Sequence, residues 1–165
     1  MPNRDGVNPL ASLDKLITGL PTAEYVMNMT VLYDDASSRG AATAIYSKVQ
    51  SVVGFSALKG TWWKLGDLRH AGVLAGAVSK AIRSDMIVIC VRQSEAVPLP
   101  FYFWVNAWLP HRLPGVGALV AMLESPDPAN SEAGRLRKYL RVVARRARMD
   151  LLIAERARDR ISFGV

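Results

Sequence analysis

Short apolar runs alternate with stretches of helical periodicity along most of the chain. Five runs rich in apolar and β-branched residues predict strands, and helical spacing follows each of the first four. The predicted strands cover residues 29–33, 57–65, 86–91, 117–123 and 149–154. The predicted helices cover residues 41–49, 69–83, 101–109 and 135–148. Because strands that alternate with helices pair through right-handed crossovers, we predict a parallel sheet with helices on both faces.

Five such units most often adopt the strand order 2-1-3-4-5, so we predict an α/β, three-layer, doubly wound sheet of the flavodoxin-like kind. The run 86–91 is apolar throughout, as expected for a central strand covered on both faces. We assign residues 26–165 to this single domain. Residues 1–25 are predicted to be an N-terminal appendage with a short amphipathic helix over 9–20, which packs on the domain or on a partner.

The composition fits a globular protein, since 50% of the residues are hydrophobic and 21% are charged. The longest apolar runs are far shorter than the roughly 20 residues of a membrane span, and the first residues do not resemble a secretory signal. We therefore expect a cytoplasmic protein without membrane contact. The single cysteine, Cys90, lies in the central apolar run and is predicted to be an inert core residue.

The formal net charge is +7, which makes contact with a polyanion worth testing. Much of the excess lies in the predicted helix 135–148, where Lys138, Arg141, Arg145 and Arg148 recur at three- and four-residue steps on one side. Aromatic residues of the kind that stack on bases do not interleave with this basic stripe. We interpret it as a solvated helix face, with nucleic-acid binding as the alternative.

Ligands of an open parallel sheet bind at the carboxyl ends of its strands, beside the point where the strand order reverses. Polar residues follow the predicted strands at that edge and line a candidate crevice there. These candidates are Asp34, Asp35, Ser37, Ser38, Arg39, Gln93, Ser94, Glu95, Glu124 and Ser125. The set forms a polar rim but contains no recognisable catalytic combination, so we assign no catalytic residue.

The acidic pair Asp34 and Asp35, which closes the first strand of this pattern, resembles the receiver domain of bacterial response regulators over most of residues 29–155. In receivers, the pair helps to hold Mg²⁺ and the third strand ends near an aspartate that accepts phosphate. The fourth and fifth strands of a receiver end near a hydroxyl residue and a lysine. The resemblance therefore predicts the fold and the location of a site, and each position can be checked in this chain.

This sequence departs from the receiver pattern at the positions that perform the chemistry. Arg92, Gln93 and Ser94 stand where the phosphoacceptor would lie, and Glu155 follows Ala154 where the lysine would lie. Ser125 is near the hydroxyl position. We therefore expect a receiver-like (pseudo-receiver) module without phosphotransfer. Weak Mg²⁺ binding by the acidic pair is one alternative, and capping of the next helix by one of the two carboxylates is the other.

The stretch 36–40 is also similar to the phosphate loop of flavodoxins, because it is short and rich in small residues. That similarity implies FMN or another small ligand as an alternative function. Asp34 and Asp35 would oppose a phosphate there unless Arg39 offsets them. No dinucleotide fingerprint or Walker loop is present, and His70 and His111 lack partners at metal-ligand spacing. We therefore predict no cofactor and no metal site.

The predicted helix 101–109 is aromatic on two sides. Phe101, Trp104 and Trp108 can face the sheet, which leaves Tyr102 and Phe103 on another side. These two residues are candidates for a contact with a protein partner, such as a second copy in a homodimer, or for cover by a neighbouring segment. The sequence thus predicts a module that acts through protein contacts rather than an enzyme.

Overall fold

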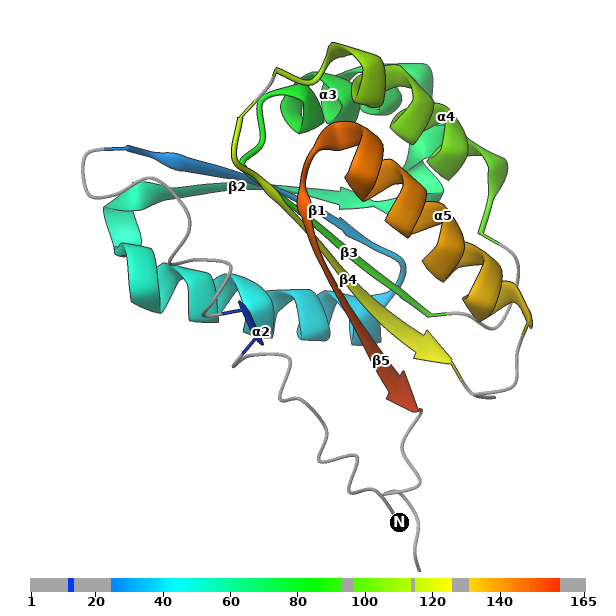
Figure 1. Cartoon of the computed structure of the whole chain (residues 1–165), viewed down its shortest axis with the longest axis horizontal. Helices are drawn as coiled ribbons and strands as arrows, with labels where there is room; N and C mark the ends of the chain where they lie inside the picture. Colours follow the sequence, from blue (N-terminus) through cyan, green and yellow to red (C-terminus); the bar gives the residue numbers. More distant parts are fainter. Residues whose placement is uncertain (1–11, 14–24, 93–96, 114, 126–130, 158–165) are drawn as a thin grey trace, which may run out of the picture.

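The computed structural model describes residues 12–13, 25–92, 97–113, 115–125 and 131–157. Its parallel sheet consists of β1 (Met27–Tyr33), β2 (Leu58–Lys64), β3 (Met86–Arg92), β4 (Ala118–Ser125) and β5 (Asp150–Ala157). The strand order is β2-β1-β3-β4-β5 (Figure 1). This order confirms the predicted flavodoxin-like, doubly wound fold.

Four α-helices in the described part of the chain cover the sheet: α2 (Ala36–Val53), α3 (Ala71–Ile82), α4 (Leu99–Trp108) and α5 (Ser131–Ala147). Figure 1 shows α2 on one face of the sheet, and α3, α4 and α5 on the other. Short 3₁₀ turns lie between helices and strands. The turn η1 (Phe55–Ala57) follows α2, η2 (Leu65–Arg69) follows β2, and η3 (Leu109–His111) follows α4. Because side chains alternate along a strand, the sheet contributes to a core on each face.

The core under α3, α4 and α5 is the larger one and is dominated by aromatic residues of α4. Phe101, Trp104, Val105 and Trp108 are buried, and the rings of Trp104 and Trp108 meet edge to face at 5.8 Å between centroids. Their spacing places them on one side of the helix. This confirms that Phe101, Trp104 and Trp108 face the sheet.

The core under α2 includes residues of β1, β3 and β4, together with Leu13. Leu13 is 1% exposed, so at least this residue of the first 25 packs into the domain. The other residues of the predicted helix 9–20, apart from Ser12, lie outside the described residues. Cys90 is buried in the same core, and burial raises the pKa of its thiol to about 12.

The start of α2 corrects the sequence prediction. The helix begins at Ala36 and not near residue 41, so the stretch 36–40 forms the first turn of α2 instead of a loop. The physical reason is the cap formed by Asp35 and Ser38, described below. The helix predicted over 69–83 is shorter, since α3 begins at Ala71 and Arg69 belongs to η2, and the remaining boundaries move by a few residues. None of the described helices has the length and apolar character needed to cross a membrane.

Candidate functional site

Asp34 and Asp35 lie directly after β1, at the carboxyl edge of the sheet. Arg92 ends β3, and Glu124 is its register partner on β4. Since β1 and β4 flank β3 on opposite sides, this register brings acidic and basic side chains from all three strands to one edge. Asp34, Asp35 and Glu124, three of the residues selected from the sequence, therefore lie at the same edge of the sheet as Arg92.

Asp35 is the N-cap of α2. Its Oδ1 accepts a hydrogen bond from the backbone N–H of Ser38 at 2.9 Å, and the Ser38 hydroxyl oxygen accepts from the backbone N–H of Asp35 at 2.8 Å. The same hydroxyl oxygen accepts from the backbone N–H of Asp34 at 2.9 Å. These bonds form a reciprocal capping box. The hydrogen bond from the Ser38 amide is the main reason that the pKa of the Asp35 carboxyl is lowered.

Arg92 places a positive charge beside the acidic pair. Its Nη1 lies 3.4 Å from Oδ2 of Asp35, and its backbone N–H donates a hydrogen bond to the Asp34 carboxyl. Burial, with a smaller contribution from the neighbouring Asp35, nevertheless raises the pKa of Asp34. The acidic pair is therefore accompanied by a guanidinium at the end of β3.

These residues do not fit a magnesium ion. One carboxylate oxygen of Asp35 accepts the Ser38 amide and the other pairs with Arg92. Mg²⁺ needs oxygen ligands in a near-ideal octahedron, which a guanidinium at this position opposes. Across the described residues, no group of three or more His, Cys, Asp or Glu side chains is placed to hold a metal.

The remaining crevice candidates have different surroundings. The Ser37 hydroxyl donates to Oε2 of Glu124 at 3.4 Å, which links the start of α2 to β4. The Arg39 guanidinium turns toward β2 instead and lies 5.4 Å from the Tyr33 ring centroid and 5.9 Å from that of Trp62. Ser125 is the last residue of β4. Gln93, Ser94 and Glu95 lie outside the described residues.

Backbone N–H groups at the start of α2 already donate hydrogen bonds within the chain. The Ser38 amide donates to the Asp35 carboxylate, and the Arg39 amide donates to the Asp35 carbonyl oxygen at 2.9 Å. A flavodoxin-type phosphate site needs such amides in an open loop that faces the ligand. The correction of 36–40 from loop to helix therefore removes the feature on which the FMN alternative depended.

The two interface candidates on α4 differ in exposure. Phe103 is 53% exposed, whereas Tyr102 is half-buried and packs edge-on against Tyr139 at 4.9 Å between ring centroids. Leu99, one helical turn before Phe103, is 63% exposed. Sequence reasoning did not select Leu99, although its four-residue separation from Phe103 was a readable signal. Leu99 and Phe103 together form the exposed apolar face of α4.

Neither histidine contributes to the crevice. His70 is the N-cap residue of α3 and His111 lies in η3, and both are exposed, as the sequence indicated. The Nε of Arg69 donates a hydrogen bond to Nε2 of His70 at 3.5 Å.

No protein-family model matches the chain, and no curated protein matches its sequence significantly. The function is therefore argued from the geometry of the chain itself.

Proposed function

We propose that this protein is a receiver-like module that does not transfer phosphate and that acts by binding a protein, with a second copy of the chain as the partner. The observation that carries the proposal is the ion pair between Arg92 and Asp35 at the carboxyl edge of the sheet. It supports a site in which the chain's own guanidinium, rather than a metal ion, lies beside the acidic pair.

Phosphotransfer to a protein carboxylate requires a nucleophilic oxygen and a cation that neutralises the incoming phosphoryl group. At the end of β3 this chain has the guanidinium of Arg92, which is a donor without a nucleophilic oxygen. Arg92 also pairs with Asp35, one of the two carboxylates from which a metal site would be built. Arg92 at the end of β3 thus offers no nucleophilic oxygen, and one of the Asp35 oxygens that a metal ion would need is already paired.

The exposed apolar face of α4 supports the second part of the proposal. Leu99 and Phe103 are neighbours on the helix surface, and each leaves more than half of its side chain in water. Aromatic side chains are enriched at the centres of protein interfaces. Burial of these two side chains against a symmetry-related copy would remove apolar area from water on both partners.

The phosphotransfer half of the proposal is tested with acetyl phosphate and magnesium. We expect the intact mass of the protein to remain unchanged after incubation, because no carboxylate stands at the positions 92–94. An acyl-phosphate adduct that maps to Asp34 or Asp35 would contradict the proposal.

The association half is tested by light scattering on the parent and on the double variant Leu99→Ser/Phe103→Ser. We expect a dimeric parent and a folded, monomeric variant, since both changes lie on the exposed face and leave Tyr102 in place. Phe55→Ser is the matched control, because Phe55 is 83% exposed but lies in η1. A parent that is monomeric at high concentration, or a double variant that still dimerises, would refute self-association through α4.

A further inference from the structure

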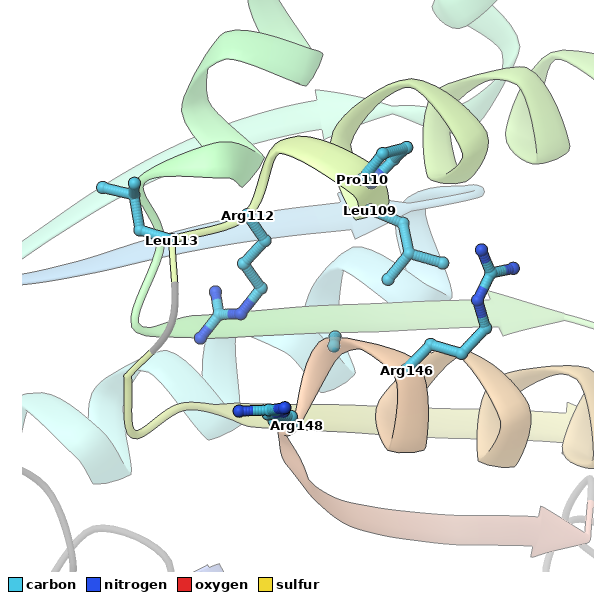
Figure 2. A pocket seen from close by; sticks show the side chains of 7 residues that line it. Leu109, Pro110, Arg112, Leu113, Arg146 and Arg148 are labelled. Atoms are coloured by element: carbon cyan, nitrogen blue, oxygen red, sulfur yellow. The ribbon is translucent and has the colours of Figure 1, made fainter.

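A pocket lies at the amino edge of the sheet, where α5 ends before β5 and η3 precedes β4. Its volume is about 250 Å³. The lining residues are Leu109, Pro110, Arg112, Leu113, Arg146, Ala147 and Arg148 (Figure 2). Three of these residues are arginines and none is acidic. The pocket therefore combines three positive charges with the apolar side chains of Leu109, Pro110 and Leu113.

The position of Arg112 is fixed by its surroundings. Its Nη1 donates to the carbonyl oxygen of Ser84 at 2.7 Å, just before β3. Gly117 makes room for it, because a Cβ at that position would collide with Nη2 of Arg112. The Nε of Arg112 is buried and has no hydrogen-bond partner in the described structure. A buried donor without a partner is costly, so the Arg112 side chain retains unused hydrogen-bonding capacity beside the pocket.

Arg148 occupies a backbone conformation that normally belongs to glycine. Its φ is 55°, and no other non-glycine residue of the described chain has a positive φ. The backbone N–H of Arg148 donates to the carbonyl oxygen of Arg145 at 3.2 Å, and the backbone N–H of Met149 donates to the carbonyl oxygen of Ala144 at 2.9 Å. These two bonds form the Schellman motif that ends α5, with arginine at the left-handed position. Strained residues of this kind cluster at functional sites.

The strained turn directs Arg148 to the pocket. Figure 2 shows the guanidinium groups of Arg112 and Arg148 on the same side of the pocket, with Arg146 beside Leu109 on the other side. The nearby carboxylate of Asp85 has other partners, since it accepts from the backbone N–H of Asn28 and from the Tyr25 hydroxyl, each at 2.9 Å. Its single negative charge offsets part of the charge of Arg112, and the three arginines still leave the pocket with an excess of positive charge.

We propose that Arg112, Arg146 and Arg148 bind the phosphate group of a small phosphate monoester, whose organic part contacts Leu109, Pro110 and Leu113. A phosphate carries close to two negative charges and accepts several guanidinium hydrogen bonds at once, whereas one carboxylate would satisfy a single arginine. The pocket is below the roughly 300–1,000 Å³ of drug-sized sites, so the ligand is compact. The site is independent of the crevice at the opposite edge of the sheet.

Calorimetric titration at low salt tests the proposal with two probes, butyl phosphate and inorganic phosphate. We expect both to bind to the parent protein, and butyl phosphate to bind several times more tightly because of the apolar wall. Equal affinities would overturn the monoester assignment in favour of free phosphate. Absence of binding by both probes would overturn the site.

Arg148→Gly separates the function of this side chain from its structural cost. We expect affinity for butyl phosphate to fall at least tenfold, because a charged ligand contact is lost. The melting temperature should rise by about 2–4 °C, because glycine adopts the left-handed conformation without strain. A stabilised variant that keeps the parent affinity would refute the proposal.

Two further variants decide whether the effect belongs to the pocket. Arg146→Gln, which removes a second lining charge, should also weaken binding. Arg141→Gln is the matched control, since Arg141 is exposed on the same helix and is not among the lining residues. If Arg141→Gln weakens binding as much as Arg146→Gln, general charge attraction explains the affinity and the proposed site is wrong.

Discussion

At the scale of single residues, the adjacent carboxylates of Asp34 and Asp35 have opposite environments. Hydrogen bonds from Ser38 hold the pKa of Asp35 below its usual value, and burial holds that of Asp34 above it. A lowered pKa means that the folded state favours the ionised form, and a raised pKa means that it favours the protonated form. The two residues therefore contribute to stability with opposite signs.

We predict that Asp35→Asn lowers the free energy of unfolding at pH 7, whereas Asp34→Asn raises it. The contribution of Asp35 is present above its unfolded pKa of about 3.9 and is lost as the pH falls through the lower folded value. Ionised Asp34 opposes folding at neutral pH, and this penalty disappears as the pH falls through its raised folded pKa. Asparagine can still cap the helix and accept the Arg92 amide.

Urea denaturation of the parent and both variants at pH 7 and pH 3 checks this prediction. Each variant should differ less from the parent at pH 3, because this pH lies below the unfolded pKa of about 3.9 of both carboxyls. Shifts of the same sign in both variants at pH 7 would show that the two environments do not differ as described.

At the scale of elements, α2 illustrates how the cap rather than apolar periodicity decides where a helix begins. Residues 36–40 contain no large apolar side chain, so the helical pattern is visible only from residue 41. The bonds between Asp35 and Ser38 start the helix earlier. At the other end, Gly54 has a φ of 98° and donates its N–H to the carbonyl oxygen of Gln50 at 3.0 Å.

The two glycines of this helix provide a matched pair of substitutions. Gly40→Ala should raise the free energy of unfolding by about 0.5–1 kcal/mol, because alanine is the better residue inside a helix. Gly54→Ala should lower it by about 1–2 kcal/mol, because a side chain opposes the positive φ. A Cβ at either position meets no atom within 4 Å, so both effects come from the backbone.

Chemical denaturation of the two alanine variants checks this pair. A neutral Gly54→Ala variant would mean that the turn after α2 readily adopts another conformation.

The sequence predicted the elements and their order well because each strand is a distinct apolar run and parallel crossovers have one hand. It also located the polar residues at the strand ends. The pairing of Arg92 with Asp35 was not predictable, because it depends on the register of β1 and β3 and on side-chain direction. The arginine pocket was not predictable for a similar reason. Arg112 and Arg148 line one pocket only because the fold brings η3 and the end of α5 together.

At the scale of the whole molecule, the net charge of +7 is unevenly distributed. Asp34 and Asp35 follow β1 and Glu124 lies in the last two residues of β4, all at the carboxyl edge, whereas the arginine pocket lies at the amino ends. The predicted basic stripe of α5 keeps Lys138, Arg141 and Arg145 exposed on the helix. Arg148 lies beyond the last helical residue and lines the pocket, so the stripe is shorter than predicted.

We predict negligible binding of a generic DNA duplex at low salt, measured by fluorescence anisotropy. The three exposed cations of the stripe can release few counterions, and no element of the described chain accompanies them as a groove reader. Micromolar binding that disappears when Lys138, Arg141 and Arg145 are changed to glutamine would contradict this prediction. Binding that those changes leave intact would direct attention to another surface.

The position of β3 between β1 and β4 determines the order in which backbone amides exchange hydrogen with solvent. Residues 86–91 are buried on both faces, and both neighbours hydrogen-bond to this strand. The amides of β3 should therefore exchange only when the domain unfolds globally, while those of β2 and β5 exchange through smaller openings at the sheet edges. Deuterium uptake followed by mass spectrometry would reveal this gradient, and fast exchange in β3 would place the most stable part of the protein elsewhere.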